Sequence, residues 1–205
     1  MSPSIPGLIP KKIRKRYTMN NSSNDLTKAF NDVSASSMGG APFLISYGAT
    51  FLITATLSFF IPRTTAALIA LFQGGIALPI AFWLERKMGI KRMTPDNPLR
   101  SLSVQMAMSQ ALGLPALILV YSLNPLGIPL ALASLGGIHF LPYAWLHRTR
   151  IYIYFAIAVS LGAFVIQIWL AKNAFSYILL FIAVAYWITM PFVYTYAKKL
   201  IKDIA

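Results

Sequence analysis

Six long apolar segments constrain the fold of this 205-residue chain more than any other feature of the sequence. A bilayer core about 30 Å thick takes about 20 helical residues to cross, and each segment is of that order. Lipid offers no hydrogen-bond partner to a peptide group, so a crossing segment must satisfy its own backbone as a helix. We therefore predict an all-α polytopic membrane protein with six transmembrane helices in three antiparallel hairpins. The predicted helices cover residues 39–61, 65–84, 98–122, 125–146, 151–171 and 174–197.

The composition excludes an ordinary soluble domain. Apolar residues make up 57% of the chain and charged residues 11%, against about 25% charged residues in soluble domains. The net charge of +13 would suit a nucleic acid only if the basic residues shared one folded face. They lie between the apolar segments instead, so we expect no nucleic-acid partner. Cysteine is absent, which excludes disulfides, thiolate metal sites and cysteine nucleophiles.

Lysine and arginine are distributed very unevenly between the two sides of a six-helix arrangement. Sixteen of the 18 fall on one side, which the positive-inside rule assigns to the cytoplasm. We therefore expect a multi-pass protein of the inner or plasma membrane with both termini in the cytoplasm. The cytoplasmic set is Lys11, Lys12, Arg14, Lys15, Arg16, Lys28, Arg86, Lys87, Lys91, Arg92, Arg100, Arg148, Arg150, Lys198, Lys199 and Lys202, and the opposite set is Arg63 and Lys172.

Residues 1–38 form a basic segment ahead of the first predicted helix. They contain no apolar stretch of the length found in a cleavable signal peptide, so we expect the first membrane helix to serve as an uncleaved anchor. Leu26, Phe30 and Val33 lie at helical spacing, which favours a short helix over residues 24–35 on the lipid surface. A solvated, disordered segment fits the composition equally well.

The lipid bilayer is the principal partner that the sequence predicts. The basic N-terminus and the loop at residues 85–100 are the expected contacts with anionic lipid. Residues 198–205 form a short cytoplasmic tail. A homo-oligomer is compatible with the polar helix faces that the spacing predicts.

Part of the sequence is repeated. Residues 74–86, GGIALPIAFWLER, align without a gap to residues 136–148, GGIHFLPYAWLHR, and six of thirteen positions are identical. Duplication of a two-helix hairpin is the interpretation we favour. The alternative is convergence, because Trp and Arg are common at the inner membrane interface. The interface and topology residues that this pattern assigns are Trp83, Arg86, Trp145, Arg148 and Arg150.

Small polar residues recur every four positions in the first helix of each predicted hairpin. A spacing of four drifts slowly around a helix, so each set forms a stripe that we expect to face other helices. Such stripes either line a solute path or hold helices together in lipid. The first stripe is Ser46, Thr50, Thr54 and Ser58, and the second is Ser101, Gln105, Ser109 and Gly113.

His139 is the ionisable residue that the sequence places inside a predicted span. It precedes Leu146 by seven residues and so lies about 10 Å from the end of that helix. It shares a helix face with Tyr143, and ionisable groups at such a depth are commonly functional. We predict a substrate path formed by His139, Gln105, Tyr143, Ser109, Thr50 and Thr54.

Catalytic, metal and cofactor sites are not expected. All five acidic residues lie outside the apolar segments, and no nucleophile or phosphate-loop motif occurs. His147 follows His139 by eight residues, or two helical turns, whereas a shared metal site needs a spacing of about one turn. We therefore predict that the chain is not an enzyme.

The motifs DNPL at residues 96–99 and HFLPYAWLHRT at residues 139–149 carry a resemblance to a known family. The chain resembles, over about residues 24–197, a family of small bacterial six-helix integral membrane proteins of unknown function. The resemblance implies a fold and a location, and it brings no catalytic residue, substrate or cofactor.

The function we expect from these observations is transport or permeation of a small neutral or cationic solute. His139 would act as a gate or proton acceptor on the path. The alternative is a helper without transport activity that binds a membrane protein or lipid through its packing faces and basic loop.

Overall fold

The computed structural model describes the backbone of residues 11–204 and the side chains of residues 24–202. The secondary structure of the described chain is helical and contains no strand. Its elements are α1 (Lys11–Ser36), η1 (Met38–Gly40), α2 (Ala41–Leu57), α3 (Arg63–Phe72), α4 (Gly74–Lys87), α5 (Arg100–Ser109), η2 (Ala111–Gly113), α6 (Leu114–Leu123), η3 (Pro125–Gly127), α7 (Ile128–Leu146), α8 (Ile151–Leu170), η4 (Ala171–Asn173) and α9 (Ala174–Ile204).

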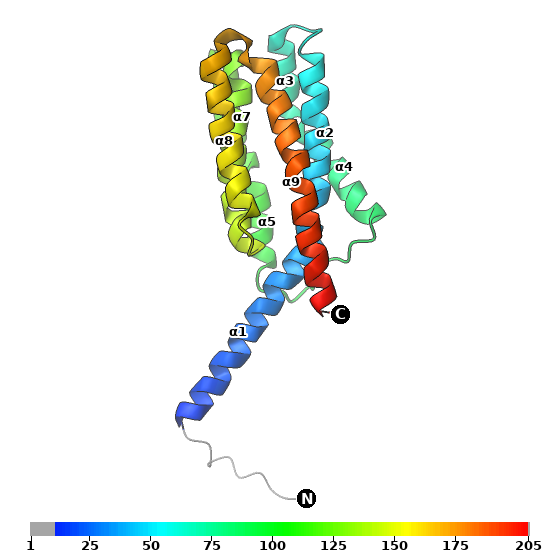
Figure 1. The fold of residues 1–205 in the computed structure, drawn as a ribbon, viewed down its shortest axis with the longest axis vertical. Helices are drawn as coiled ribbons and strands as arrows, with labels where there is room; N and C mark the ends of the chain where they lie inside the picture. Colours follow the sequence, from blue (N-terminus) through cyan, green and yellow to red (C-terminus); the bar gives the residue numbers. More distant parts are fainter. Residues whose placement is uncertain (1–10, 205) are drawn as a thin grey trace, which may run out of the picture.

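Several of these helices are long and apolar enough to cross a membrane. By length and composition four segments of the described chain qualify, or five if the bent pair α3 and α4 is counted as one span. One of the four, Ile151–Lys202, contains both α8 and α9, which lie side by side in Figure 1 because the chain reverses at η4. The other three segments are Met38–Leu57, Arg100–Leu123 and Pro125–Leu146. The all-helical class predicted from the sequence is thus confirmed, with several helices long and apolar enough to cross a membrane.

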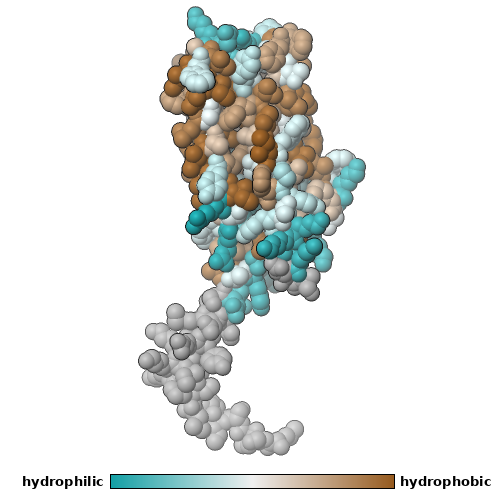
Figure 2. Space-filling view, in the orientation of Figure 1, coloured by the Kyte–Doolittle hydropathy of each residue, from teal (hydrophilic) through white to brown (hydrophobic). Residues whose placement is uncertain are grey.

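The outer surface of the helices is hydrophobic. Figure 2 shows hydrophobic side chains over the middle of the helical bundle and hydrophilic ones toward its ends. Leu112 and Trp169 are 82% and 83% exposed. Soluble monomers rarely expose so much contiguous apolar surface to water. Contact of the same surface with lipid carries no free-energy cost of this kind.

The core of the bundle is formed by α2, α7, α8 and α9. Close approach of α2 and α9 depends on Gly48, because a Cβ there would lie 2.4 Å from the Trp187 ring. Trp187 Nε1 donates a hydrogen bond to the Ile45 carbonyl of α2 at 3.2 Å. In lipid, association of helices relies on such close packing and hydrogen bonding, because burial of apolar surface brings no gain there.

Hydroxyl groups of α2 bond to the helices on either side. Ser46 Oγ donates to the Ala77 carbonyl of α4 at 2.6 Å. Ser58 Oγ donates to Ser176 Oγ of α9 at 2.7 Å. The stripe of α2 therefore faces other helices, as its spacing predicted, and it holds them together.

Helix α1 packs against the bundle along its last turns. Phe30 and Val33 are buried with Leu99 and Leu146, so residues 24–35 belong to a longer helix that leaves the bundle in Figure 1. Of the basic groups predicted to meet anionic lipid, the side chains of residues 11–16 lie outside the described part.

His147 fastens α1 to the end of α7. It is 3% exposed, and its Nδ1 lies 3.0 Å from Ser34 Oγ. The rings of Tyr143 and Tyr152 flank the imidazole, at centroid distances of 5.9 and 5.6 Å. Burial disfavours the charged imidazolium and lowers the pKa of His147 to about 4.

Two predicted helices are interrupted near their middle, and here the structure differs from the sequence prediction. The predicted helix over residues 65–84 is divided into α3 and α4, which meet at Gln73 with a bend of 44°. Gly74 and Gly75 are weak helix formers, and Pro79 cannot bond the Gly75 carbonyl.

The predicted helix over residues 98–122 is divided into α5, η2 and α6. Pro115 has no N–H for the Ala111 carbonyl, and its ring crowds that turn, so the helix tightens at residues 111–113 and restarts.

The two copies of the sequence repeat occupy different surroundings. Trp83 and Trp145 are each 55% exposed, but the glycines differ. A Cβ on Gly137 would lie 1.9 Å from Ser160 Oγ and 2.8 Å from a backbone oxygen of α8, whereas one on Gly75 would meet nothing within 4 Å. The repeat therefore conserves the interface end of the helix and not its packing.

The buried His147 predicts a fall in stability with acidification. The unfolded chain takes up a proton below about pH 6.5, while the folded chain resists it down to about pH 4, so the free energy of unfolding falls over that window. The full loss is about 3 kcal/mol. We expect His147→Gln to be less stable than the wild type at pH 7 and to show a flatter dependence between pH 6.5 and 4, measured by thermal unfolding in detergent. An unchanged slope in the variant would contradict this assignment.

The glycine contacts predict opposite outcomes for two matched substitutions. Gly137→Ala forces α7 and α8 apart, and we expect a loss of about 1–3 kcal/mol of stability. Gly75→Ala, at the aligned position of the repeat, has open space and gains helix propensity, so its stability should equal or exceed that of the wild type. Thermal unfolding of both variants in the same detergent checks the pair, and equal destabilisation would count against the described α7–α8 contact.

Candidate functional site

The side chain of His139, a residue of α7, lies against α5. The half-buried imidazole has its Nδ1 3.4 Å from Ser109 Oγ of α5. The Tyr143 ring lies one turn further along α7, at a centroid distance of 5.1 Å. Three of the predicted path residues, His139, Ser109 and Tyr143, therefore come together.

Aromatic rings close the interior behind His139. The Phe140 ring stacks on Tyr152 at 5.5 Å and meets the rings of Phe155 and Tyr186 edge-on, at 4.8 and 5.7 Å. These rings fill the space between α7, α8 and α9. A polar group that approaches His139 would therefore come along α5 rather than through the core.

The polar stripe of α5, which we define as Ser101, Gln105 and Ser109, is exposed. The sequence predicted that this stripe would face other helices, and the contact is limited to Ser109, which lies beside His139 of α7. Helix α5 packs mainly against α7 and buries none of its residues. Gln105 Nε2 donates to Ser101 Oγ at 3.4 Å, and Ser109 Oγ donates to the Met106 carbonyl at 2.7 Å. The stripe ends at His139.

Thr50 and Thr54 are buried in α2, away from the exposed stripe of α5. They are 7% and 1% exposed, and their hydroxyls donate to carbonyls of their own helix, those of Tyr47 and Thr50, at 3.0 and 2.8 Å. Among the described contacts, none joins either threonine to His139. Their positions suit helix packing.

The interruption between α3 and α4 holds an unpaired amide. Gln73 is 5% exposed. Its Oε1 is the one buried side-chain nitrogen or oxygen atom of the described residues that has no hydrogen-bond partner. A Cβ on Gly74 would lie 3.3 Å from the Tyr47 hydroxyl, so this hydroxyl sits beside the interruption. Buried polar atoms are rarely left unpaired in native proteins, and such atoms mark sites that a donor reaches.

A second glutamine lies at the interruption of the next span. Gln110 is exposed and directly precedes η2. It lies ten residues after Arg100, and Gln73 lies ten residues after Arg63, which is about 15 Å of helix in each case. Both amides therefore lie near the middle of their segments. Three residues after Gln110, a Cβ on Gly113 would lie 3.6 Å from the Leu135 side chain of α7.

Sequence reasoning missed both glutamines. Each lies in a long apolar run, and the mean hydropathy of that run does not reveal the glutamine. The available signal was the local sequence, a glutamine followed by two glycines in QGG at residues 73–75 and by glycine and proline in QALGLP at residues 110–115. Such combinations disfavour a continuous helix.

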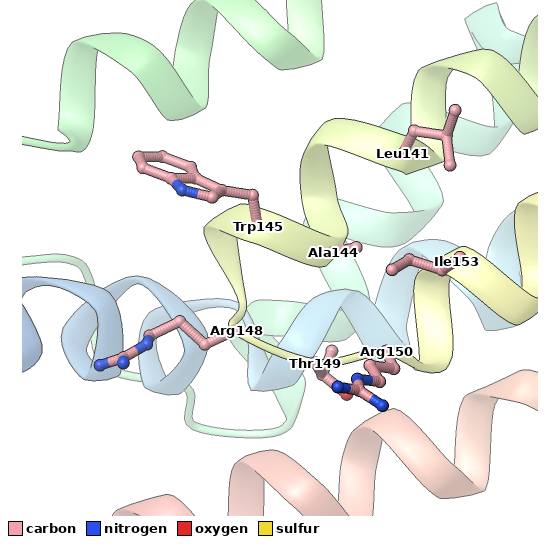
Figure 3. A pocket seen from close by; sticks show the side chains of 7 residues that line it. All are labelled: Leu141, Ala144, Trp145, Arg148, Thr149, Arg150 and Ile153. Atoms are coloured by element: carbon pink, nitrogen blue, oxygen red, sulfur yellow. The ribbon is translucent and has the colours of Figure 1, made fainter.

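The predicted interface residues gather at helix ends. Arg86 is exposed near the end of α4, where Lys87 lies over the Trp83 ring at 4.8 Å. Trp145, Arg148 and Arg150 line a groove of about 410 Å³ at the turn between α7 and α8 (Figure 3).

A second groove of about 520 Å³ lies on the α1 side of Trp145. It is lined by residues of α1 and by the same Trp145 and Arg148. Neither groove is lined by His139, so the groove region and the histidine region are separate features.

Comparison with known proteins gives a family and no function. The family described as "Family of unknown function (DUF7010)" matches residues 26–196. A search of curated proteins and a search of solved structures each found no match to this chain. The matched region includes α2 to α8, most of α9 and the part of α1 that packs on the bundle, which is all of the site described above. The chain therefore belongs to this family of unknown function.

Proposed function

We propose that the chain crosses the inner or plasma membrane six times, with both termini in the cytoplasm, and carries a small neutral or cationic solute along the exposed polar stripe of α5. Six crossings follow if α3 with α4 forms one bent span and if α8 and α9 each cross once. The strong asymmetry of lysine and arginine supports the orientation.

The polar stripe of α5 is the observation that carries the transport proposal. Ser101, Gln105 and Ser109 are exposed on a helix without buried residues, within the segment Arg100–Leu123. The Gln105 amide donates to Ser101, and the rest of its hydrogen-bonding capacity would find no partner in hydrocarbon. An unpaired polar group there costs several kcal/mol, on the order of transfer to a purely apolar solvent. A water-filled path removes this cost, because water pairs with each group.

The interrupted helices support the same proposal. Broken helices at mid-membrane free backbone and amide groups for a bound solute, and transporters use them for this purpose. Here the side-chain Oε1 of Gln73 is an unpaired acceptor. The main-chain carbonyl of Gln73 accepts from both Ile76 N and Ala77 N, at 3.0 and 2.8 Å. Because α3 packs against α6 and α7, the two interruptions belong to neighbouring helices.

His139 would sense what passes along the stripe. Imidazole can donate and accept hydrogen bonds and can take up a proton. Its Nδ1 lies beside Ser109, the last residue of the stripe. We therefore assign His139 the role of gate or proton acceptor, with Tyr143 beside it.

A second candidate function is that of a helper that binds another membrane protein. Only 6% of the apolar window of the segment Arg100–Leu123 is buried, so a partner helix could cover the stripe and pair with its amides. This candidate needs no water path. A helper of this kind would produce no solute flux, whereas a transporter would.

Removal of the histidine tests the transport proposal. We expect proteoliposomes with the wild-type chain to take up glycerol or tetramethylammonium, or to dissipate a pH gradient reported by an internal dye, faster than protein-free liposomes. His139→Ala should reduce that flux at least tenfold, because the polar contact at the end of the stripe is lost. Ser109→Ala should reduce it less, because the imidazole remains.

Ser122→Ala is the matched control for Ser109→Ala. Ser122 is also exposed on this segment and also donates to a carbonyl of its own helix, that of Leu119, at 2.8 Å. The solute flux of the Ser122→Ala variant should equal that of the wild type. Flux and pH dependence that are unchanged in His139→Ala would remove the proposed role, and the absence of wild-type flux for every probe would favour the helper.

A further inference from the structure

The turn between α7 and α8 carries a cation held in a fixed position. Arg148 has a φ of +50°, a conformation that costs about 1 kcal/mol or more for a residue other than glycine. The Tyr196 hydroxyl of α9 donates to the Arg148 carbonyl at 3.0 Å, and Arg148 Nη1 donates to Thr27 Oγ1 of α1 at 3.3 Å. Helices α1 and α9 therefore both contact this one residue.

Aromatic rings hold the guanidinium further. Its central carbon lies 5.5 Å from the centre of the Phe30 ring, which in turn meets the Trp145 ring edge-on at 4.9 Å. This arrangement of Trp145, Phe30 and Arg148 stands between the two grooves. A guanidinium fixed in this way loses little side-chain entropy when it binds an anion.

The grooves combine basic and apolar walls. One is lined by Arg148, Thr149 and Arg150 at the turn and by Leu141 and Ile153 toward the helices, as Figure 3 shows. The other adds apolar residues of α1. No acidic residue lines either groove, so the positive charge there is not balanced by a carboxylate in the lining.

The depth of the turn relative to the apolar segments indicates which kind of ligand fits the grooves. Residues 147–150 connect two apolar segments that end and begin at Leu146 and Ile151, so they lie at the depth of lipid headgroups. Leu141 lies five residues further in, about 7 Å along the helix. A molecule that matches this order has a phosphate at the turn and an acyl chain along the helices.

We propose that the turn between α7 and α8 binds one anionic phospholipid, with its headgroup between Arg148 and Arg150, whose side chains flank the turn in Figure 3, and an acyl chain against Leu141 and Ile153. Trp145 marks the interface beside it, as tryptophan does at membrane surfaces. Arginine forms paired, charge-assisted hydrogen bonds with phosphate. This site is distinct from the basic loop at residues 85–100, where the sequence predicted lipid contact.

Native mass spectrometry of the full chain in a neutral detergent tests the proposal. Phosphatidylglycerol should bind more tightly than phosphatidylcholine with the same acyl chains. In Arg148→Gln/Arg150→Gln, binding of phosphatidylglycerol should weaken about thirtyfold, from about a fivefold effect for each basic residue at a membrane surface. Arg150→Gln alone should show part of this loss. Because the Arg150 side chain has no hydrogen bond to another described residue, that variant leaves the fold untouched.

Lys198→Gln/Lys199→Gln is the matched control. Both residues are exposed on α9, their substitution also removes two charges from the predicted cytoplasmic side, and they line neither groove and lie outside the loop at residues 85–100. This variant should keep the lipid preference of the wild type. Equal losses in both double variants, or no preference in the wild type, would overturn the proposal. Glycerol phosphate that binds as tightly as the lipid would also overturn it, because the acyl chain would then contribute nothing.

Discussion

The structure depends on one constraint, that a peptide or amide group inside a bilayer must find a hydrogen-bond partner within the protein or in a water-filled space. A continuous helix meets this constraint by itself, and α2, α7, α8 and α9 do so over most of their length. At Gln73 and Gln110 the helices are interrupted, yet main-chain N–H groups still donate to the carbonyls of both residues. The group that the protein leaves unpaired is the side-chain Oε1 of Gln73.

Two ways of using polar side chains therefore coexist in one small protein. On α2 the hydroxyls of Ser46 and Ser58 bond to α4 and α9, and the result is adhesion between helices that gain nothing from apolar burial in lipid. On α5 the same kind of stripe, with the same spacing, remains exposed and leads to His139. The difference lies in the neighbours, because α2 is enclosed by α4 and α9 whereas α5 has mainly α7. The aromatic cluster around Phe140 keeps the polar approach on the α5 side.

Hydropathy and charge predict much of this from sequence, since long apolar runs have few structures open to them in lipid. The start of η3 follows from local chemistry, because the Asn124 side chain accepts from Leu126 N at 3.2 Å. Contacts between distant residues do not follow: Ser34 and His147 are 113 residues apart, and no spacing rule joins them. Asn97 combines both kinds of contact: its Oδ1 accepts from the nearby Leu99 N at 2.9 Å, and its Nδ2 donates to Asp32 of α1 at 2.7 Å. The exposure of the α5 stripe was not predicted, because periodicity defines a face and does not say what covers it.

Water access to the α5 stripe is the central claim, and the absence of native cysteine makes it directly measurable. Single cysteines at Ser101, Gln105 and Ser109 can be compared, in membranes, with cysteines at Val104 and Ala107, which are equally exposed on other faces of the same helix. A water-soluble maleimide applied from the cytoplasmic side should label the three stripe positions and leave Val104→Cys and Ala107→Cys unlabelled. Stripe cysteines that are no more reactive than these two controls would contradict the account, because the stripe would then face lipid or a partner helix rather than water.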